Sequence, residues 1–165
     1  AWPMHYMNLL LKLREWHPEF DPVKSGEVQT RLSRLLWEQF NMPKESCDEA
    51  ERALEKFPKH PSVVNGDMCW IAAEGTRQLA FEQKTNREGF EFFKQAKQWY
   101  ETYQKKFGGG QYNKRNGDDP KSEVQKRIEE RFVGSALGRG RCRGRGGPPA
   151  RRRTMAGDFV NVHQG

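Results

Sequence analysis

An arginine- and glycine-rich segment near the C-terminus has the residue types best suited to a specific chemistry. Residues 138–147 read GRGRCRGRGG, and three more arginines follow at 151–153. Each guanidinium is a planar fork of N–H donors that binds a phosphate through two hydrogen bonds or stacks on an exposed base. The pattern therefore predicts RNA binding through Arg139, Arg141, Arg143, Arg145, Arg151, Arg152 and Arg153.

The net charge is concentrated in the same region. The chain carries a formal charge of +7, and the residues after Gly134 hold seven arginines and one acid, a balance of +6. A block of like charge repels itself and stays extended until a polyanion neutralises it. We therefore expect an Arg/Gly-rich tail at 134–165 that is disordered when free. Its RNA affinity should fall by orders of magnitude between low and moderate salt.

Other uses of a basic run are a solubilising tail and a nuclear-import signal. We favour nucleic acid over both, and RNA over DNA, because arginine-rich disordered segments commonly fold on RNA. The tail glycines at 138, 140 and 144 do not indicate a dinucleotide-binding loop. Such a loop needs a strand before it and a helix after it, and the sequence predicts neither here.

Four cations outside the tail are candidates to extend its basic surface onto the folded body. They are Lys105, Lys106, Lys114 and Arg115. Trp99, Tyr100 and Tyr103 precede them in sequence, and such rings either stack on bases or anchor a partner. Aromatic stripes at helical spacing are more often core, so we expect the cations to form the surface and the rings to be buried.

The sequence gives little support for metal binding or catalysis. Cys47, His60 and Cys69 lie within 23 residues, but zinc sites usually have cysteines in close pairs such as C-x2-C, and no such pair is present. We expect buried or neutral structural cysteines, no metal and no cofactor. The glutamates have the spacing of solvated helix faces and the four histidines are scattered. We therefore expect no enzymatic activity.

Three cysteines that match no disulfide framework favour a reducing, intracellular setting, either cytoplasmic or nuclear, or a virion. Cys142 lies among four arginines, which should lower the pKa of its thiol and favour oxidation. No apolar run of about 18 residues is present to span a membrane. The chain begins at Ala1, which fits either removal of an initiator methionine or cleavage from a precursor.

Helical spacing of apolar residues dominates the first 133 positions, with no alternating strand pattern of useful length. We predict an all-α fold of about six helices, arranged as a helical bundle or as repeat-like helix pairs. The predicted helices cover residues 4 to about 17, 21–40, 46–57, 67–79, 85–107 and 119–133.

Start signals define several of these helices. Ser46 and Thr85 each open a capping box, in which the first and fourth side chains satisfy each other's free amides. Asp67 is a predicted N-cap, and Asp119-Pro120 opens the last helix. The prolines at 58 and 61 predict a stiff connector.

The final helix has one apolar residue per turn, at Val124, Ile128 and Phe132. So narrow a stripe indicates a helix that docks on another element. We therefore divide the chain into an α-helical domain at 1–107, a flexible basic hinge at 108–118, a docking helix at 119–133 and the tail at 134–165.

Residues 50–58 resemble the closing part of a tetratricopeptide repeat. The residues that carry the resemblance are Ala50, Ala53, Leu54 and Pro58, and the stretches 46–57 and 96–107 have small or aromatic residues at equivalent places. The resemblance implies stacked helix pairs that form a groove for a peptide or protein partner.

We expect a non-enzymatic, RNA-binding structural protein, with a helical body for protein contacts and self-assembly. A viral nucleocapsid or coat subunit and a cellular ribonucleoprotein component share this design. The expected partners are RNA and protein, in a homo-oligomer or a large assembly, and no membrane. The apolar stretch at 159–162 is either a frayed terminus or a docking peptide for a neighbouring subunit. The alternative is a tetratricopeptide-like adaptor that binds a protein partner in a helical groove.

Overall fold

Helices provide all the regular secondary structure at residues 2–16 and 22–134, the parts of the chain that the computed structural model describes. The elements there are α1 (Trp2–Trp16), α2 (Pro22–Glu38), α3 (Pro43–Lys56), α4 (Pro61–Val64), α5 (Asp67–Glu82), α6 (Asn86–Lys106), the 3-10 helix η1 (Gln111–Asn113) and α7 (Glu123–Glu129). The all-α prediction is confirmed. The tail prediction concerns residues that lie almost entirely outside this description.

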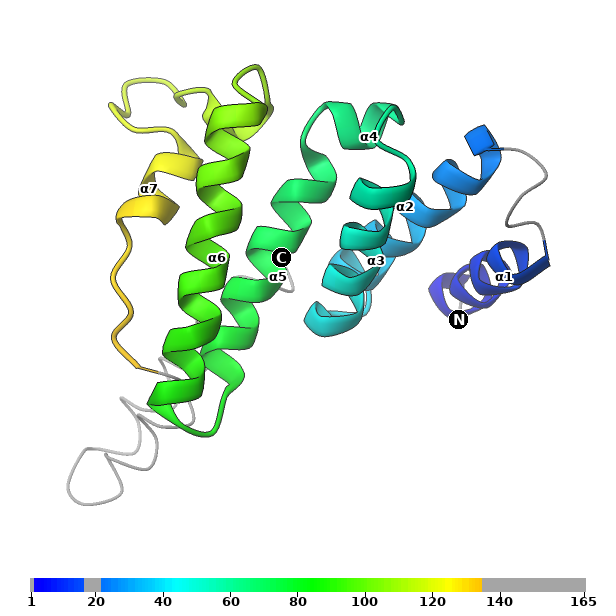
Figure 1. Ribbon diagram of the computed structural model, residues 1–165, viewed down its shortest axis with the longest axis horizontal. Helices are drawn as coiled ribbons and strands as arrows, with labels where there is room; N and C mark the ends of the chain where they lie inside the picture. The colour runs from blue at the N-terminus through cyan, green and yellow to red at the C-terminus, as the bar shows by residue number, and fades with distance from the viewer. Residues whose placement is uncertain (1, 17–21, 135–165) are drawn as a thin grey trace.

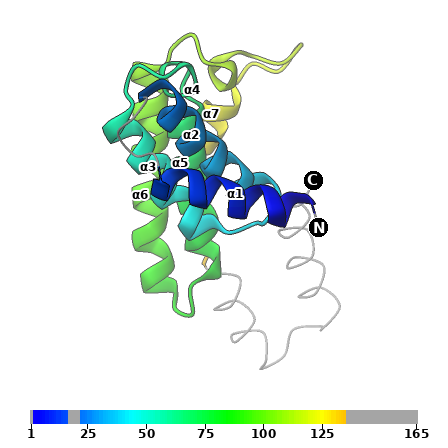
Figure 2. The ribbon, with the colours of Figure 1, turned by 90° about the vertical axis from the view of Figure 1, so that its right-hand side faces the viewer.

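The helices pack mainly against their neighbours in sequence: α1 on α2, α2 on α3, α3 on α5, α5 on α6 and α6 on α7. Figure 1 shows the result as a row of helices that runs from α1 on one side to α6 and α7 on the other. Figure 2, which views the row from the α1 side, shows α1 lying across its end. The tetratricopeptide-like repeat stays a prediction.

The aromatic residues of α6 form part of the core. Tyr100 and Tyr103 are each 1% exposed, and both pack against Trp70 of α5. Trp99 is partly buried against the same cluster. The prediction that these rings are core residues is confirmed.

Small residues allow α3 and α5 to approach closely. Ala50 and Ala53 are fully buried against α5, and a Cβ at Gly75 would overlap the sulfur of Cys47. Burial raises the pKa of Cys47 and of Cys69 to about 12, so both thiols stay protonated. Both are free and buried, as expected for structural cysteines.

Three of the predicted helix-start signals do not act as predicted. α3 begins at Pro43, three residues before Ser46, whose buried hydroxyl donates to the Pro43 carbonyl at 3.0 Å instead of capping a helix. α5 is capped by Gly66, at φ +91, and Asp67 is already its first residue. α7 begins at Glu123, because the Ser122 hydroxyl accepts from the Gln125 amide at 3.2 Å. The predicted cap at Thr85 is confirmed, since it accepts from the Glu88 amide at 3.2 Å.

α7 also ends earlier than predicted, at Glu129, and residues 130–134 continue without helical structure. The predicted connector at 58–61 contains the start of an additional helix, the single turn α4. The prolines there were predicted only to stiffen the chain. Pro61 instead occupies the first turn of α4, where its missing N–H leaves no hydrogen bond unmade.

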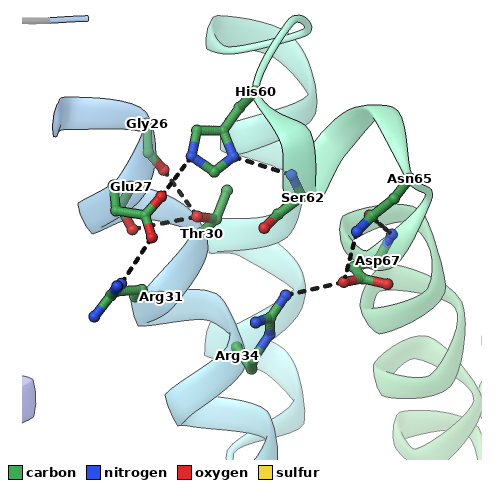
Figure 3. A network of polar contacts seen from close by, with 9 residues as sticks. All are labelled: Gly26, Glu27, Thr30, Arg31, Arg34, His60, Ser62, Asn65 and Asp67. Atoms are coloured by element: carbon green, nitrogen blue, oxygen red, sulfur yellow. Dashed lines mark hydrogen bonds and ion pairs between the residues drawn. The ribbon is translucent and has the colours of Figure 1, made fainter. Parts of the chain in front are cut away.

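His60 caps α4 and ties it to α2, as Figure 3 shows. Its Nδ1 accepts from the Ser62 amide at 3.1 Å, which places the proton of the neutral ring on Nε2. That nitrogen lies 2.8 Å from a carboxylate oxygen of Glu27, to which it donates. Nearby, Arg34 of α2 donates to Asp67 at 3.0 Å. These contacts fix the corner between α4 and α5 against α2.

Candidate nucleic-acid interface

The predicted RNA contacts fall into two groups. The seven tail arginines at 139–153 lie outside the described residues. The other four cations are described, and all are exposed. Lys105 and Lys106 are in the last turn of α6, and Lys114 and Arg115 follow η1.

A glycine turn connects these two pairs of cations. The Gly110 amide donates to the Phe107 carbonyl at 2.8 Å, which closes the turn after α6. A Cβ at Gly110 would overlap the hydroxyl of Tyr103. That hydroxyl accepts from the Tyr112 amide at 3.1 Å. Glycine at 110 therefore lets η1 lie directly against a buried tyrosine of α6.

The Tyr112 side chain attaches η1 to α5. Its ring stacks on Trp70 with 3.9 Å between the ring centroids and 9° between the planes. Asn113 adds a hydrogen bond of 2.5 Å from its side-chain amide to the Phe107 carbonyl. Residues 108–118 were predicted as a flexible hinge. These contacts hold the part of that segment up to Asn113 on the helical body, while the proposed division at 107 and 118 stays a prediction.

Two hollows flank this glycine turn and η1. One, of about 580 Å³, lies between the turn and the corner of α4 and α5, and both Lys106 and Lys114 line it. Asp67, which is paired with Arg34, lies on its opposite side. The other hollow, of about 450 Å³, is lined by Trp37, Trp70 and Tyr112, and again by Lys114. Lys114 therefore lies between the two hollows.

A buried ionic network holds α7 in place beside the second hollow. Glu74 of α5 is 6% exposed, and its Oε1 accepts from the Tyr100 hydroxyl at 2.8 Å and from Arg127 Nε at 2.9 Å. Arg77 of α5 donates to both carboxylate oxygens of Glu130, at 2.7 and 2.6 Å. Burial raises the pKa of Tyr100 well above its usual value, and the charge of Glu74 adds to this effect.

The tail begins at the opposite end of α6 from the four cations. Gly134 is buried, and a Cβ there would lie 3.1 Å from the side-chain oxygen of Asn86, the first residue of α6. α6 has 21 residues, which corresponds to a length of about 30 Å. Figure 1 shows both ends of the helix. The four cations of the body therefore lie at the other end of α6 from the start of the tail, and their role as an extension of its basic surface stays a prediction.

Sequence reasoning missed the aromatic hollow. Tyr112 falls within the predicted flexible hinge at 108–118, and the sequence assigns no role to Trp37. The available signal was a lone aromatic residue in an otherwise polar loop, which favours attachment to the body. Its partner, Trp70, is 42 positions earlier in the chain.

Within residues 2–16 and 22–134, no group of three His, Cys, Asp or Glu side chains could hold a metal ion. No helix in that part of the chain is both long and apolar enough to cross a bilayer. Comparison with known proteins gives no match to a family model, to a curated protein or to a solved structure.

Proposed function

We propose that this protein is a non-enzymatic, RNA-binding structural protein, in which the helical body makes protein contacts and the arginine-rich tail neutralises RNA phosphates. The charge distribution carries the proposal, because +6 of the net +7 lies after Gly134. A dense guanidinium block of this kind binds phosphate strongly and with little regard to base sequence. The tail supplies affinity, and the body positions the protein in an assembly.

Features of the body are compatible with this role. Lys106 and Lys114 lie together at one hollow and give a second, smaller basic area. Trp2, Met4 and Leu9 of α1 are 85%, 48% and 51% exposed at the end of the helical row, where a second subunit or another protein would meet an apolar surface. A coat subunit and a component of a cellular ribonucleoprotein would use these features in the same way.

The direct test compares the full chain with a chain that lacks residues 135–165, using a single-stranded RNA oligonucleotide at several salt concentrations. Six neutralised phosphates on single-stranded RNA predict a log–log salt slope of about −4 for the full chain. The shortened chain should lose most of both the affinity and the slope. Unchanged affinity after truncation would overturn the proposal.

Two full-length variants make this test independent of truncation. Changing all seven tail arginines to serine should have the same effect as the deletion, whereas changing them to lysine should keep most of the salt slope, because lysine keeps the charge. Light scattering with and without RNA then separates the two forms of the proposal. Long regular particles would indicate a coat protein, and one-to-one complexes a ribonucleoprotein component.

The alternative proposal is a tetratricopeptide-like adaptor that binds a protein in a helical groove. Helix-to-neighbour packing from α1 to α6 favours it, because stacked helix pairs pack in this way. An adaptor should capture its partner equally well when the tail arginines are serine. Oligomers that form only with RNA would count against it.

A further inference from the structure

The hollow of about 450 Å³ between the end of α2, α5, η1 and α7 has features that the tail chemistry does not use. Three aromatic side chains line it, from three different elements: Trp37, Trp70 and Tyr112. The remaining lining residues are all polar or charged. Planar rings combined with a few polar groups are typical of a site for a flat, polar ligand.

The aromatic part of the hollow is held by packing and by a hydrogen bond. Trp70 is 7% exposed and is held by edge contacts with Tyr100 and Tyr103, at centroid distances of 5.4 and 5.3 Å. Tyr112 stacks face to face on Trp70 and is itself fixed through its amide to Tyr103. A stack held in this way needs little reorganisation to accept another ring. Stacking of a nucleic-acid base on an aromatic side chain contributes about 1–3 kcal/mol.

The charges around the hollow favour one kind of base. Arg127 lies 2.9 Å from Glu74 and 3.4 Å from Glu123, so these two lining carboxylates are already paired. Glu38, the last residue of α2, is exposed, and no ion pair joins it to another described residue. A carboxylate only accepts hydrogen bonds. Among the RNA bases, guanine offers two adjacent donors on its Watson–Crick edge, N1–H and the N2 amino group.

The acids near the stack also affect the pKa of Tyr112. Burial raises the pKa of the Tyr112 hydroxyl, and the negative charges of Asp67, Glu74 and Glu38 raise it further. On the other side, Lys114 lines both this hollow and the neighbouring one that Lys106 also lines. A nucleotide whose base stacks on Tyr112 would therefore have an ammonium group within reach of its phosphate.

We propose that this hollow binds a guanine base of single-stranded RNA, with the ring stacked on Tyr112, the base edge at Glu38 and the phosphate at Lys114. This inference rests on the proposed RNA-binding function and adds a base preference that a phosphate-binding tail does not supply. Gln111 and Asn116 also line the hollow, and their amides can bind the remaining polar atoms of the base.

The test titrates the full-length protein with guanosine and adenosine 5′-monophosphate and follows tryptophan fluorescence. The two nucleotides carry the same charge, so attraction to the tail is equal and the difference reports on the base. We expect at least about tenfold tighter binding of the guanine nucleotide, the size of a bidentate discrimination. Glu38→Gln should reduce the preference to within about twofold, while Glu101→Gln, at an exposed glutamate of α6, should leave it unchanged.

A second pair of variants tests the stack. Tyr112→Leu should weaken both nucleotides by about tenfold or more, and Tyr112→Phe should bind them as the unchanged protein does, because it keeps the ring. Tyr112 is half-buried, so the binding data for Tyr112→Leu are interpreted only if the circular dichroism spectrum of this variant matches that of the unchanged protein. Glu38→Gln changes an exposed side chain and tests the inference even if Tyr112→Leu does not fold.

Equal binding of the two nucleotides, or a preference that survives Glu38→Gln, would overturn the guanine site. Binding of N-acetyl-arginine amide at the same residues, without binding of the guanine nucleotide, would also overturn it and would indicate a site for a protein arginine. These outcomes are distinct from failure of the proposed function. A chain that binds RNA with a steep salt slope but without base preference keeps the tail proposal and loses the guanine site.

Discussion

The two ends of α6 are built from similar residues and differ in what they leave open. At the C-terminal end, the glycine turn brings Tyr112 onto Trp70, with a hollow on either side of Lys114. At the N-terminal end, Phe132 lies 5.7 Å from Phe81 and 5.3 Å from Phe93 between ring centroids. We call these the open end and the closed end.

Aromatic residues and glycines are present at both ends, so composition alone does not separate them. At the closed end, a Cβ at Gly89 would lie 2.6 Å from the Ala80 carbonyl and 2.8 Å from the Phe132 ring. Glycine at 89 therefore lets both groups pack directly against α6, and no room is left between them. At the open end, Gly110 allows a stack whose surroundings remain polar and accessible. The closed end fixes Gly134, where the tail starts, against the first residue of α6, whereas the open end contains the proposed guanine site.

Chain length limits how the two ends cooperate. Arg139 is five residues beyond Gly134, and a chain of that length spans at most about 18 Å, whereas α6 is about 30 Å long. The backbone at Arg139 therefore cannot reach the C-terminal end of α6. An RNA bound at both Arg139 and Lys114 would extend along the body.

The largest expected effect comes from removing Glu130, which ties the end of α7 to α5 where the chain sets out toward the closed end. Glu130→Ala leaves Arg77, whose side chain is 10% exposed, without its bidentate partner. Removing one member of a buried pair should lower the free energy of unfolding by about 3 kcal/mol. Urea unfolding followed by circular dichroism measures this loss.

Two controls define the cause. Glu129→Ala removes an exposed pair with Lys121 and should change stability by less than about 1 kcal/mol. The double variant Arg77→Met with Glu130→Met should recover much of the loss, because it removes both charges. A loss at Glu130 no larger than that at Glu129 would show that the ion pair does not hold the end of α7 on α5.

The next effect is at the open end, at Gly110. Gly110→Ala places a Cβ where the Tyr103 hydroxyl lies and should lower the free energy of unfolding by about 2 kcal/mol, as overpacking does. It should also weaken binding at the aromatic hollow, because η1 must move. Gly109→Ala is the matched control, since a Cβ there meets nothing within 4 Å, and it should change stability by less than about 0.5 kcal/mol. Equal effects at 109 and 110 would mean that η1 is not held against Tyr103.

Part of the structure of the closed end could be predicted from the sequence, but almost nothing of the open end. Thr85 was identified as a cap because its partner, Glu88, lies three residues away. The stack of Tyr112 on Trp70 could not be predicted, because it joins segments that are distant in sequence and depends on how α5 and α6 pack. Charge identified Lys114 as exposed, but not the hollows beside it.

The errors at helix starts have a common physical reason. Ser46 and Asp67 both have side chains suited to capping, and each instead makes a contact in the fold: Ser46 with the Pro43 carbonyl and Asp67 with Arg34. Local capping signals compete with tertiary contacts for the same polar side chain. The helical spacing of apolar residues does not depend on this competition, so it still predicted the helices themselves.

A smaller effect, on the pH dependence of stability, tests the contact between α5 and α6. This contact lies between the open end and the closed end. Cys69 of α5 donates to the Trp99 carbonyl at 3.6 Å. Burial raises the pKa of its thiol to about 12, whereas an unfolded thiol has a pKa of about 8.5. Above about pH 9 the unfolded chain loses this proton first, so the free energy of unfolding falls by about 1.4 kcal/mol per pH unit for this thiol.

Urea unfolding at pH 8, 9 and 10 measures this fall, and Cys69→Ala should show a slope smaller by about 1.4 kcal/mol per unit above pH 9. Cys47→Ala should behave in the same way, because burial also raises the pKa of the Cys47 thiol to about 12. The same slope in the variant and in the unchanged protein would mean that solvent reaches Cys69 and that α5 and α6 separate more readily than their packing suggests.

The smallest effect is on RNA binding, and it tests whether the two ends differ in function. Lys114→Gln removes one exposed cation at the open end and should reduce the salt slope for single-stranded RNA by about 0.7, with little change in stability. Lys84→Gln removes an exposed cation in the turn before α6, at the closed end, and should leave the slope unchanged, because Lys84 lines neither of the two hollows beside Lys114. Fluorescence anisotropy across a salt series measures both slopes. Equal decreases would mean that a lysine at the aromatic hollow contributes no more to RNA binding than a lysine remote from it, and the functional distinction between the two ends would be wrong.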